Sequence, residues 1–310
     1  MAGGRLSTSK KSADAKERDL LKFCGPTEYA LQNLENLVLY CQHVEGFNDP
    51  FEFWTEFLKG VPDPEKERAR FVAAATAWGF PDFDAAMAQD PAEYFESLEG
   101  LQPPFEDMRD GMRIACFGSE AENLLMWSHY ADGLRGFCIA FDETLIVEQE
   151  PEGYLTDVAY LDRPPQVDSF VYAVAVDQED YHLMAIDETQ TAVTYLGKTD
   201  EVKWIPIYKQ EAKAALSHMH RLWQHAFAAK PLEWQYERER RLLVQTWEDD
   251  KAAILRPYPK EAVRGITIGE RMPPAYRERL LAIVHKVCGA IPVRTARRAS
   301  DQYTLIIESP

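Results

Sequence analysis

The order of its predicted helices and strands constrains the fold of this chain more than any other feature of the sequence. Helical patterns dominate early, over residues 28–38 and most of 51–98, whereas strand patterns dominate later. Elements grouped in this way are typical of an α+β fold with a mostly antiparallel central sheet. No stretch rich in proline, glycine and serine marks a boundary, so we predict a single domain over residues 20–310. Residues 53–105 are predicted to be an inserted helical region, and residues 1–19 a disordered tail.

The strand candidates are short apolar or alternating runs bounded by turn residues. They cover residues 20–24, 38–42, 112–117, 136–142, 154–162, 169–177, 241–247, 265–269, 291–296 and 303–309. Two further helices are predicted over residues 208–229 and 273–287, and the second begins with prolines, which a helix tolerates at its start.

The sequence WSHYAD, at residues 127–132, is the first candidate for a functional site. Ser119 and Glu122 have the spacing of a capping box ahead of a helix that carries this motif. On that helix Trp127 and Tyr130 are three residues apart and share one face, which favours a core position. His129 lies nearer the polar side, where it fits a site residue as well as a structural histidine.

The sequence FNDPFE, at residues 47–52, is the second candidate. Asn and Asp bond to their own backbone and proline fixes φ, so the sequence is typical of a turn. Such a turn would also present Asn48, Asp49 and Glu52 as polar groups on a rigid support. The sequence leaves both roles open.

Glu237 and Glu239 form the third candidate, an E-x-E pair directly before a predicted apolar strand. In an extended segment both carboxylates point the same way, about 7 Å apart. Two carboxylates on one face repel, so one pKa rises, and such pairs are useful where positive charge develops in a reaction. If Lys230 and Arg241 balance the pair, the segment is instead a charge run with salt bridges.

The composition excludes several function classes. A formal net charge of −17 repels a phosphate backbone, so we expect no bulk nucleic-acid binding, although one positive pocket could hold a small anionic ligand. No apolar run approaches the roughly 20 residues of a membrane span, so no membrane partner is expected. The five cysteines form no C-x-x-C pair, which favours reduced thiols and a cytoplasmic protein. On the predicted 208–229 helix, His218 and His225 are two turns apart and His220 faces away, so no metal is expected.

Taken together, the three motifs resemble a widespread family of bacterial proteins of unknown function. The stretches that carry the resemblance are LENLVLYCQHVEGFNDPFE, CFGSEAENLLMWSHYADGLRGFCIAFD, KPLEWQYERERRLL and GITIGE, with a final pair of strands. The resemblance covers roughly residues 20–308 and implies no particular activity.

The layout is also similar to that of the ADP-ribosyltransferase superfamily, in which an early Arg or His and a later Tyr hold NAD and a late Glu assists the departure of nicotinamide. The resemblance implies an ADP-ribosyltransferase-like fold with NAD as substrate. A carboxylate would stabilise the positive charge that forms as the bond to nicotinamide breaks. The implied roles are electrostatic catalysis by Glu239, acceptor activation by Glu237, ring stacking by Tyr130 or Trp127, and ribose or amide binding by His129 and Asn48. Lys22 stands where the superfamily usually has an Arg or His.

Three hypotheses for function follow. The first is an NAD-consuming enzyme, a bacterial toxin or phage-defence effector with an unknown protein or nucleic-acid acceptor, in which the three motifs border one pocket. The second is a metal-dependent hydrolase or nuclease that uses Asp49, Glu52, Glu237 and Glu239 around a hard cation, with Lys230 nearby. The third is a non-catalytic module that binds a small ligand or regulates another protein.

Overall fold

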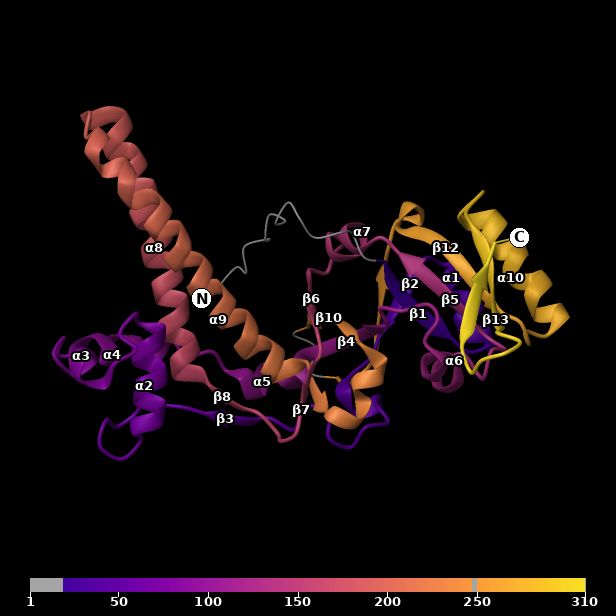
Figure 1. Cartoon of the computed structure of the whole chain (residues 1–310), viewed down its shortest axis with the longest axis horizontal. Helices are drawn as coiled ribbons and strands as arrows, with labels where there is room; N and C mark the ends of the chain where they lie inside the picture. Colours follow the sequence, from indigo (N-terminus) through magenta and orange to yellow (C-terminus); the bar gives the residue numbers. More distant parts are fainter. Residues whose placement is uncertain (1–18, 247–249, 310) are drawn as a thin grey trace. The chain divides into compact units, whose positions relative to one another are not determined.

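The fold divides into two compact units, each assembled from separate segments of the chain (Figure 1). The computed structural model describes residues 19–246 and 250–309. Unit 1 holds the described residues up to Leu39, then Cys116–Glu152 and the chain from Leu255 onward, while unit 2 holds Tyr40–Ala115 and the described part of Gly153–Ile254. The single domain over residues 20–310 stays a prediction. The predicted tail lies outside the described residues except for Asp19.

Unit 1 is built on a five-stranded sheet in the order β1-β5-β12-β13-β14, in which only β12 and β13 are parallel. A two-stranded sheet, β11-β2, accompanies it. The elements, with η marking a 3-10 helix, are β1 (Leu20–Cys24), α1 (Glu28–Glu35), β2 (Val38–Cys41), α6 (Leu124–Tyr130), β5 (Phe137–Phe141), α7 (Glu143–Val147), β11 (Ile254–Pro257), η5 (Lys260–Ala262), β12 (Val263–Gly269), α10 (Pro274–Val287), β13 (Val293–Arg298) and β14 (Leu305–Glu308).

Alternating side chains of this sheet pack against different helices. Phe23 and Cys138 belong to an apolar cluster that also contains Trp127 of α6. Phe137, next to Cys138 in β5, instead lies with its ring centre 6.5 Å from that of Tyr276 in α10. The alternation predicted for residues 136–142 is therefore confirmed as a strand that is buried on both faces.

Unit 2 combines a three-stranded sheet, β4-β10-β6, with two short parallel pairs, β3-β8 and β7-β9. Its elements are η1 (Val44–Gly46), β3 (Glu56–Leu58), α2 (Arg68–Ala77), α3 (Phe83–Met87), α4 (Ala92–Leu98), η2 (Glu99–Leu101), α5 (Phe105–Gly111), β4 (Met112–Phe117), β6 (Gly153–Asp157), β7 (Ala159–Leu161), β8 (Gln166–Asp168), α8 (Ser169–Leu196), η3 (Thr199–Trp204), α9 (Ile205–Phe227), β9 (Ala229–Pro231), η4 (Leu232–Glu237) and β10 (Arg240–Gln245).

The helices α2, α3 and α4 lie within the helical region that the sequence predicted over residues 53–105. Phe71 of α2 and Phe95 of α4 pack against Phe170 and Val174 of α8 in one apolar cluster. The first turns of α8 therefore serve as the core of this region.

The strand predicted over residues 169–177 is wrong, because these residues form the start of α8. Asp168 caps this helix by accepting hydrogen bonds from the backbone N–H groups of Phe170 and Val171. Every residue from Ser169 to Ala175 is buried. A helix that is apolar all round has no periodicity to distinguish it from a buried strand, and this explains the error.

The fold class is confirmed as α+β, with several mostly antiparallel sheets. The ADP-ribosyltransferase-like fold stays a prediction. Among the described residues, no helix combines the length and the apolar character needed to cross a membrane.

Candidate functional site

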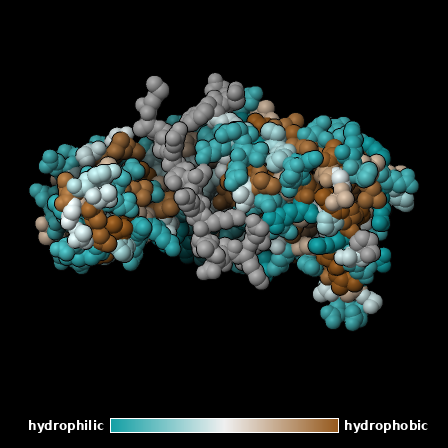
Figure 2. All heavy atoms as spheres, turned by 90° about the horizontal axis from the view of Figure 1, so that it is seen from above, coloured by the Kyte–Doolittle hydropathy of each residue, from teal (hydrophilic) through white to brown (hydrophobic). Residues whose placement is uncertain are grey.

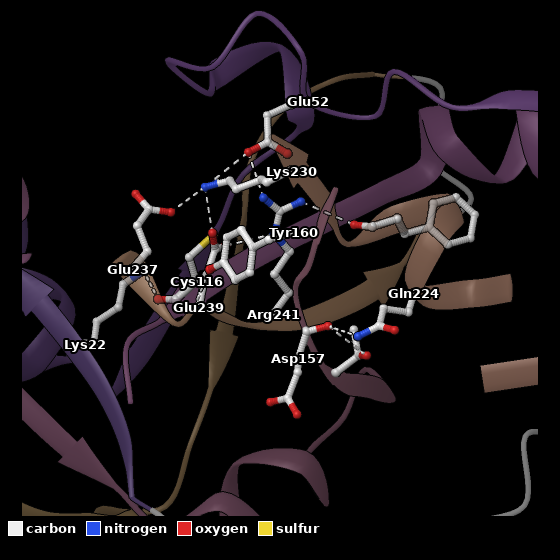
Figure 3. A network of polar contacts seen from close by, with 12 residues as sticks. Lys22, Glu52, Cys116, Asp157, Tyr160, Gln224, Lys230, Glu237, Glu239 and Arg241 are labelled. Carbon is white, nitrogen blue, oxygen red and sulfur yellow. Dashed lines mark hydrogen bonds and ion pairs between the residues drawn. The ribbon is translucent and has the colours of Figure 1, made fainter. Parts of the chain in front are cut away.

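A buried group of charged side chains in unit 2 contains the E-x-E motif (Figure 3). We call it the charge cluster, and its side chains are only 0–5% exposed. Its members are Glu52, Lys230, Glu237, Glu239 and Arg241. Such burial of charge is rare unless each group is paired.

The two glutamates reach the cluster through a turn and not through an extended segment. Glu237 is the last residue of η4, and Arg238 then adopts a left-handed conformation with φ 43°. Glu239 follows, with its N–H donating to the Tyr160 hydroxyl at 2.8 Å and its carbonyl accepting from Val158 at 3.0 Å. The predicted extended segment is therefore wrong, because η4 extends to Glu237, although both carboxylates point toward Lys230.

The Lys230 ammonium is the centre of the cluster. Its Nζ lies 2.7 Å from Glu237 Oε2, 2.6 Å from Glu239 Oε2 and 3.4 Å from Glu52 Oε1. Burial alone lowers the pKa of Lys230, but the nearby carboxylates, Glu239 above all, outweigh it and raise the pKa above the usual value. The side chain is therefore a permanent cation.

The Arg241 guanidinium is the second cation of the cluster. It donates to Glu52 Oε1 at 2.7 Å, to Glu239 Oε1 at 2.8 Å and to the Phe227 carbonyl at 3.3 Å. Glu239 is thus held by both cations, one at each carboxylate oxygen. This arrangement agrees with the hypothesis from the sequence that Lys230 and Arg241 balance the charges of Glu237 and Glu239.

The cluster pairs three carboxylates with two cations, so one negative charge is in excess. Asp49, buried on the same turn as Glu52, adds a further carboxylate. Oδ2 of Asp49 and Oε2 of Glu52 are buried and accept no hydrogen bond within the described residues. Buried acceptors of this kind point to water or a ligand donor beside the turn.

FNDPFE forms the predicted turn. Asp49 Oδ1 accepts from the Phe51 N–H at 2.9 Å, and the Glu52 N–H donates to the Asp49 carbonyl at 3.3 Å. Asn48 is exposed on this turn. The turn is anchored inward by Glu52, which carries its carboxylate into the charge cluster.

The outer face of the same turn exposes two aromatic rings. Phe51 and Trp54 are 45% and 58% exposed, and their rings stack with centres 5.1 Å apart at 12°. Between them in sequence, Phe53 has φ 55° and is buried against Phe227. Because the backbone of Phe53 is left-handed, its side chain is buried while the side chains of Phe51 and Trp54 face outward.

A pocket of about 730 Å³ lies beside this aromatic pair, within the size range of small-molecule sites. Its lining residues are Trp54, Thr55, Glu56, Arg163, Pro164 and Gln166. Arg163 is exposed and forms no ion pair in the described part of the chain. The Gln166 amide donates to Glu56 at 2.6 Å across the β3-β8 pair, and the Thr55 hydroxyl donates to the His225 carbonyl at 2.9 Å.

WSHYAD lies in unit 1, where Trp127 is 0% exposed. Its Nε1 donates to the Ala121 carbonyl at 2.7 Å, and its ring meets Phe23 edge to face at 5.5 Å. Tyr130 is half-buried against the apolar cluster that contains Trp127, whereas His129 is exposed. Packing therefore accounts for Trp127, and the ligand roles of all three side chains stay predictions.

The predicted capping box of this helix is wrong. Asn123, and not Ser119, is the N-cap residue of α6, and its side chain accepts from the N–H groups of Leu125 and Met126 at 3.1 and 3.2 Å. Both residue types cap helices well, so spacing alone selected the wrong one.

Lys22 is half-buried in β1 of unit 1, and its Nζ donates to the Cys116 carbonyl at 3.0 Å. Lys22, Trp127, His129 and Tyr130 thus belong to unit 1, while the FNDPFE and E-x-E residues belong to unit 2. The pocket predicted to join all three motifs stays a prediction.

Within the residues that the structure describes, no group of three His, Cys, Asp or Glu side chains is arranged to hold a metal ion. The Lys230 ammonium occupies the centre of the one buried group of carboxylates that the second hypothesis would use.

Sequence reasoning missed Trp54, Arg163 and Tyr160. Trp54 comes two residues after the end of FNDPFE and fits no apolar period, which is a usable signal for an exposed aromatic residue. Arg163 precedes two prolines in a loop and carried no signal of its own.

One comparison with known proteins gives a match. A family model described as a protein of unknown function (DUF2971) matches residues 126–242, a segment that includes WSHYAD and E-x-E but begins after FNDPFE. No curated protein and no solved structure matches the chain. The predicted relation to a family of unknown function is thus confirmed for this segment, and the relation to ADP-ribosyltransferases stays a prediction.

Proposed function

We propose that unit 2 binds a small anionic ligand with a flat ring, in the pocket beside Phe51 and Trp54, and that NAD is the first ligand to test. The observation that carries the proposal is the exposed ring of Trp54, which stacks on Phe51 and lines a pocket that also holds Arg163. Adjacent exposed apolar side chains indicate a binding site more strongly than single exposed ones do.

The lining residues supply the groups that a nucleotide needs. Trp54 offers a ring face for stacking, which is worth about 1–3 kcal/mol per base. Arg163 offers a planar fork for a phosphate, and Glu56 with Gln166 offers acceptors and a donor for sugar hydroxyls.

The charge cluster is connected to this site through Glu52. Glu52 joins the cluster from the turn that presents Phe51 and Trp54, so the inner ion pairs fix the outer rings. Pre-organised aromatic groups bind more tightly because less side-chain freedom is lost on binding.

Consumption of the bound NAD, as in ADP-ribosyltransferases, is the second candidate function. The excess negative charge of the cluster favours it, because buried carboxylates stabilise developing positive charge. Against it, both oxygens of Glu239 are held by cations. The toxin or phage-defence role comes from the resemblance alone. A cytoplasmic location is proposed with it, since all five cysteines are free thiols.

The test is calorimetric titration of NAD into the full chain, with nicotinamide release followed in parallel. We expect Trp54→Ala to raise the Kd by about tenfold or more, because it removes the stacking surface. Arg163→Gln should weaken binding as well, and more strongly at low salt, because it removes the cation.

Two matched controls keep this test specific. Tyr29→Ala removes another exposed ring, and Arg277→Gln another exposed arginine, both in unit 1. Neither should change the Kd. Absence of NAD binding to the wild type, or equal loss in the controls, would overturn the proposal for NAD. Binding without nicotinamide release would leave a binding module, whereas release that a folded Glu239→Gln variant lacks would support the enzyme.

A further inference from the structure

The helical hairpin of α8 and α9 has two unlike halves. In its inner half, α8 is buried from Ser169 to Ala175, and α9 buries Met219, Trp223 and Phe227. In its outer half, from Asp177 to Glu211, Thr189 is the only buried residue. Figure 1 shows this outer half extending beyond α2, α3 and α4 of the same unit. We call residues 177–211 the outer hairpin.

Large apolar side chains are concentrated on the outer hairpin. Of the twenty large hydrophobic residues that are exposed among the described residues, eight lie here: Tyr181, Leu183, Met184, Tyr195, Leu196, Val202, Trp204 and Ile207. Figure 2 shows hydrophobic residues exposed among hydrophilic ones at the end of the view that holds α8 and α9. Tyr181, Met184 and Tyr195 share one face of α8 by helical spacing.

Two helices alone do not form a stable core, because each can bury only one face. Antiparallel helices reach a stable arrangement when two hairpins pack into a four-helix bundle. We infer that the outer hairpin pairs with the same hairpin of a second copy of this chain, forming an antiparallel four-helix bundle.

The charges of the two helices fit a second copy. Helix α8 contains five acidic residues and no Lys or Arg, whereas α9 contains three basic residues and one acidic residue. Glu188, Lys209 and Lys213 are exposed and form no ion pair within the described residues. A two-fold axis places α8 of each copy beside α9 of the other, so that each contact joins opposite charges twice.

The positions along the hairpin also match. Glu188 lies eight residues before the end of α8, and Lys213 lies eight residues after the start of α9. With the tips of two hairpins aligned, these side chains come to the same level.

The first experiment measures the mass of the full chain by light scattering after size exclusion. We expect twice 35.5 kDa for the wild type and 35.5 kDa for Met184→Glu and Tyr195→Glu. Tyr29→Glu, which changes an equally exposed ring in unit 1, should remain dimeric. Circular dichroism verifies that the variants keep their helices.

Charge exchange sharpens the test. A chain with Asp187→Lys and Glu188→Lys, and a chain with Lys209→Glu and Lys213→Glu, should each be monomeric. Mixed together, they should form a heterodimer, because each acidic helix again meets a basic one. A monomeric wild type would overturn the inference, and so would a dimer that survives Met184→Glu and Tyr195→Glu or two charge variants that fail to associate.

Discussion

The charge cluster of unit 2 and two cysteines of unit 1 show opposite outcomes of burying titratable groups. In unit 2, the charge cluster buries three carboxylates and pairs them with Lys230 and Arg241. In unit 1, Cys138 is buried and Cys24 is partly buried, and the Lys22 ammonium only partly offsets the effect of burial on Cys24. Burial raises the pKa of Cys24 to about 11, although Lys22 acts against it, and raises that of Cys138 well above its usual value. The charge cluster pairs its buried charges, whereas burial disfavours the charged form of these two thiols.

This difference also separates the environments of the WSHYAD and E-x-E motifs. WSHYAD contributes Trp127 to an apolar cluster, where any charge would be costly. E-x-E contributes two carboxylates to a network that depends on charge. Neither motif opens its buried side chains to solvent, whereas Phe51 and Trp54, at the FNDPFE turn, are exposed.

The largest effect should come from breaking the charge cluster. Lys230→Met removes the cation that three carboxylates share, so we expect the free energy of unfolding to fall by about 3–5 kcal/mol. The measurement is urea unfolding followed by tryptophan fluorescence. Lys260→Met, at an exposed lysine, is the control and should change stability by about 0.5 kcal/mol or less.

A loss below about 1 kcal/mol in Lys230→Met would contradict the cluster as described, because it would mean that the carboxylates are solvated. The variant Lys230→Arg keeps the charge and should recover part of the stability. Its recovery would separate the loss of charge from the loss of packing.

An intermediate effect should come from alkaline pH acting on unit 1. The pKa of Cys24 rises from 9.0 to about 11 on folding, so the folded state holds its proton more tightly than the unfolded state. The resulting stability is fully present below pH 9 and is lost as the pH rises through 11. The thiol is partly exposed, so we expect about 1–2 kcal/mol over the whole window.

The control for this prediction is the variant Cys24→Ala, which keeps the other groups that lose a proton at alkaline pH. Tyr154 and Tyr172, whose pKa values burial raises to about 12, titrate in both proteins and cancel in the difference. The stability of the wild type relative to Cys24→Ala should therefore fall between pH 9 and 11. A constant difference across that range would show that the thiol is not shielded from solvent.

Periodicity predicted the fold where side chains alternate along an element and failed where a helix is apolar all round. Strand 137–141 alternates and was predicted correctly, whereas the start of α8 is buried all round and was misread as a strand. The charge balance of Lys230, Glu237, Glu239 and Arg241 could be read from their nearness in sequence. Their partner Glu52 lies almost two hundred residues away in the chain, and only folding brings it to the cluster.

The smallest effect should come from the cap of α6, which carries WSHYAD in unit 1. Asn123 accepts hydrogen bonds from two backbone N–H groups at the start of this helix, so Asn123→Ala should lower the free energy of unfolding by about 1 kcal/mol. Asn123→Asp keeps an acceptor at the cap and should remain near the wild type. Urea unfolding of the wild type, Asn123→Ala and Asn123→Asp measures these differences. Equal losses in both variants would mean that the other contacts of Asn123, and not its cap, hold the helix in place.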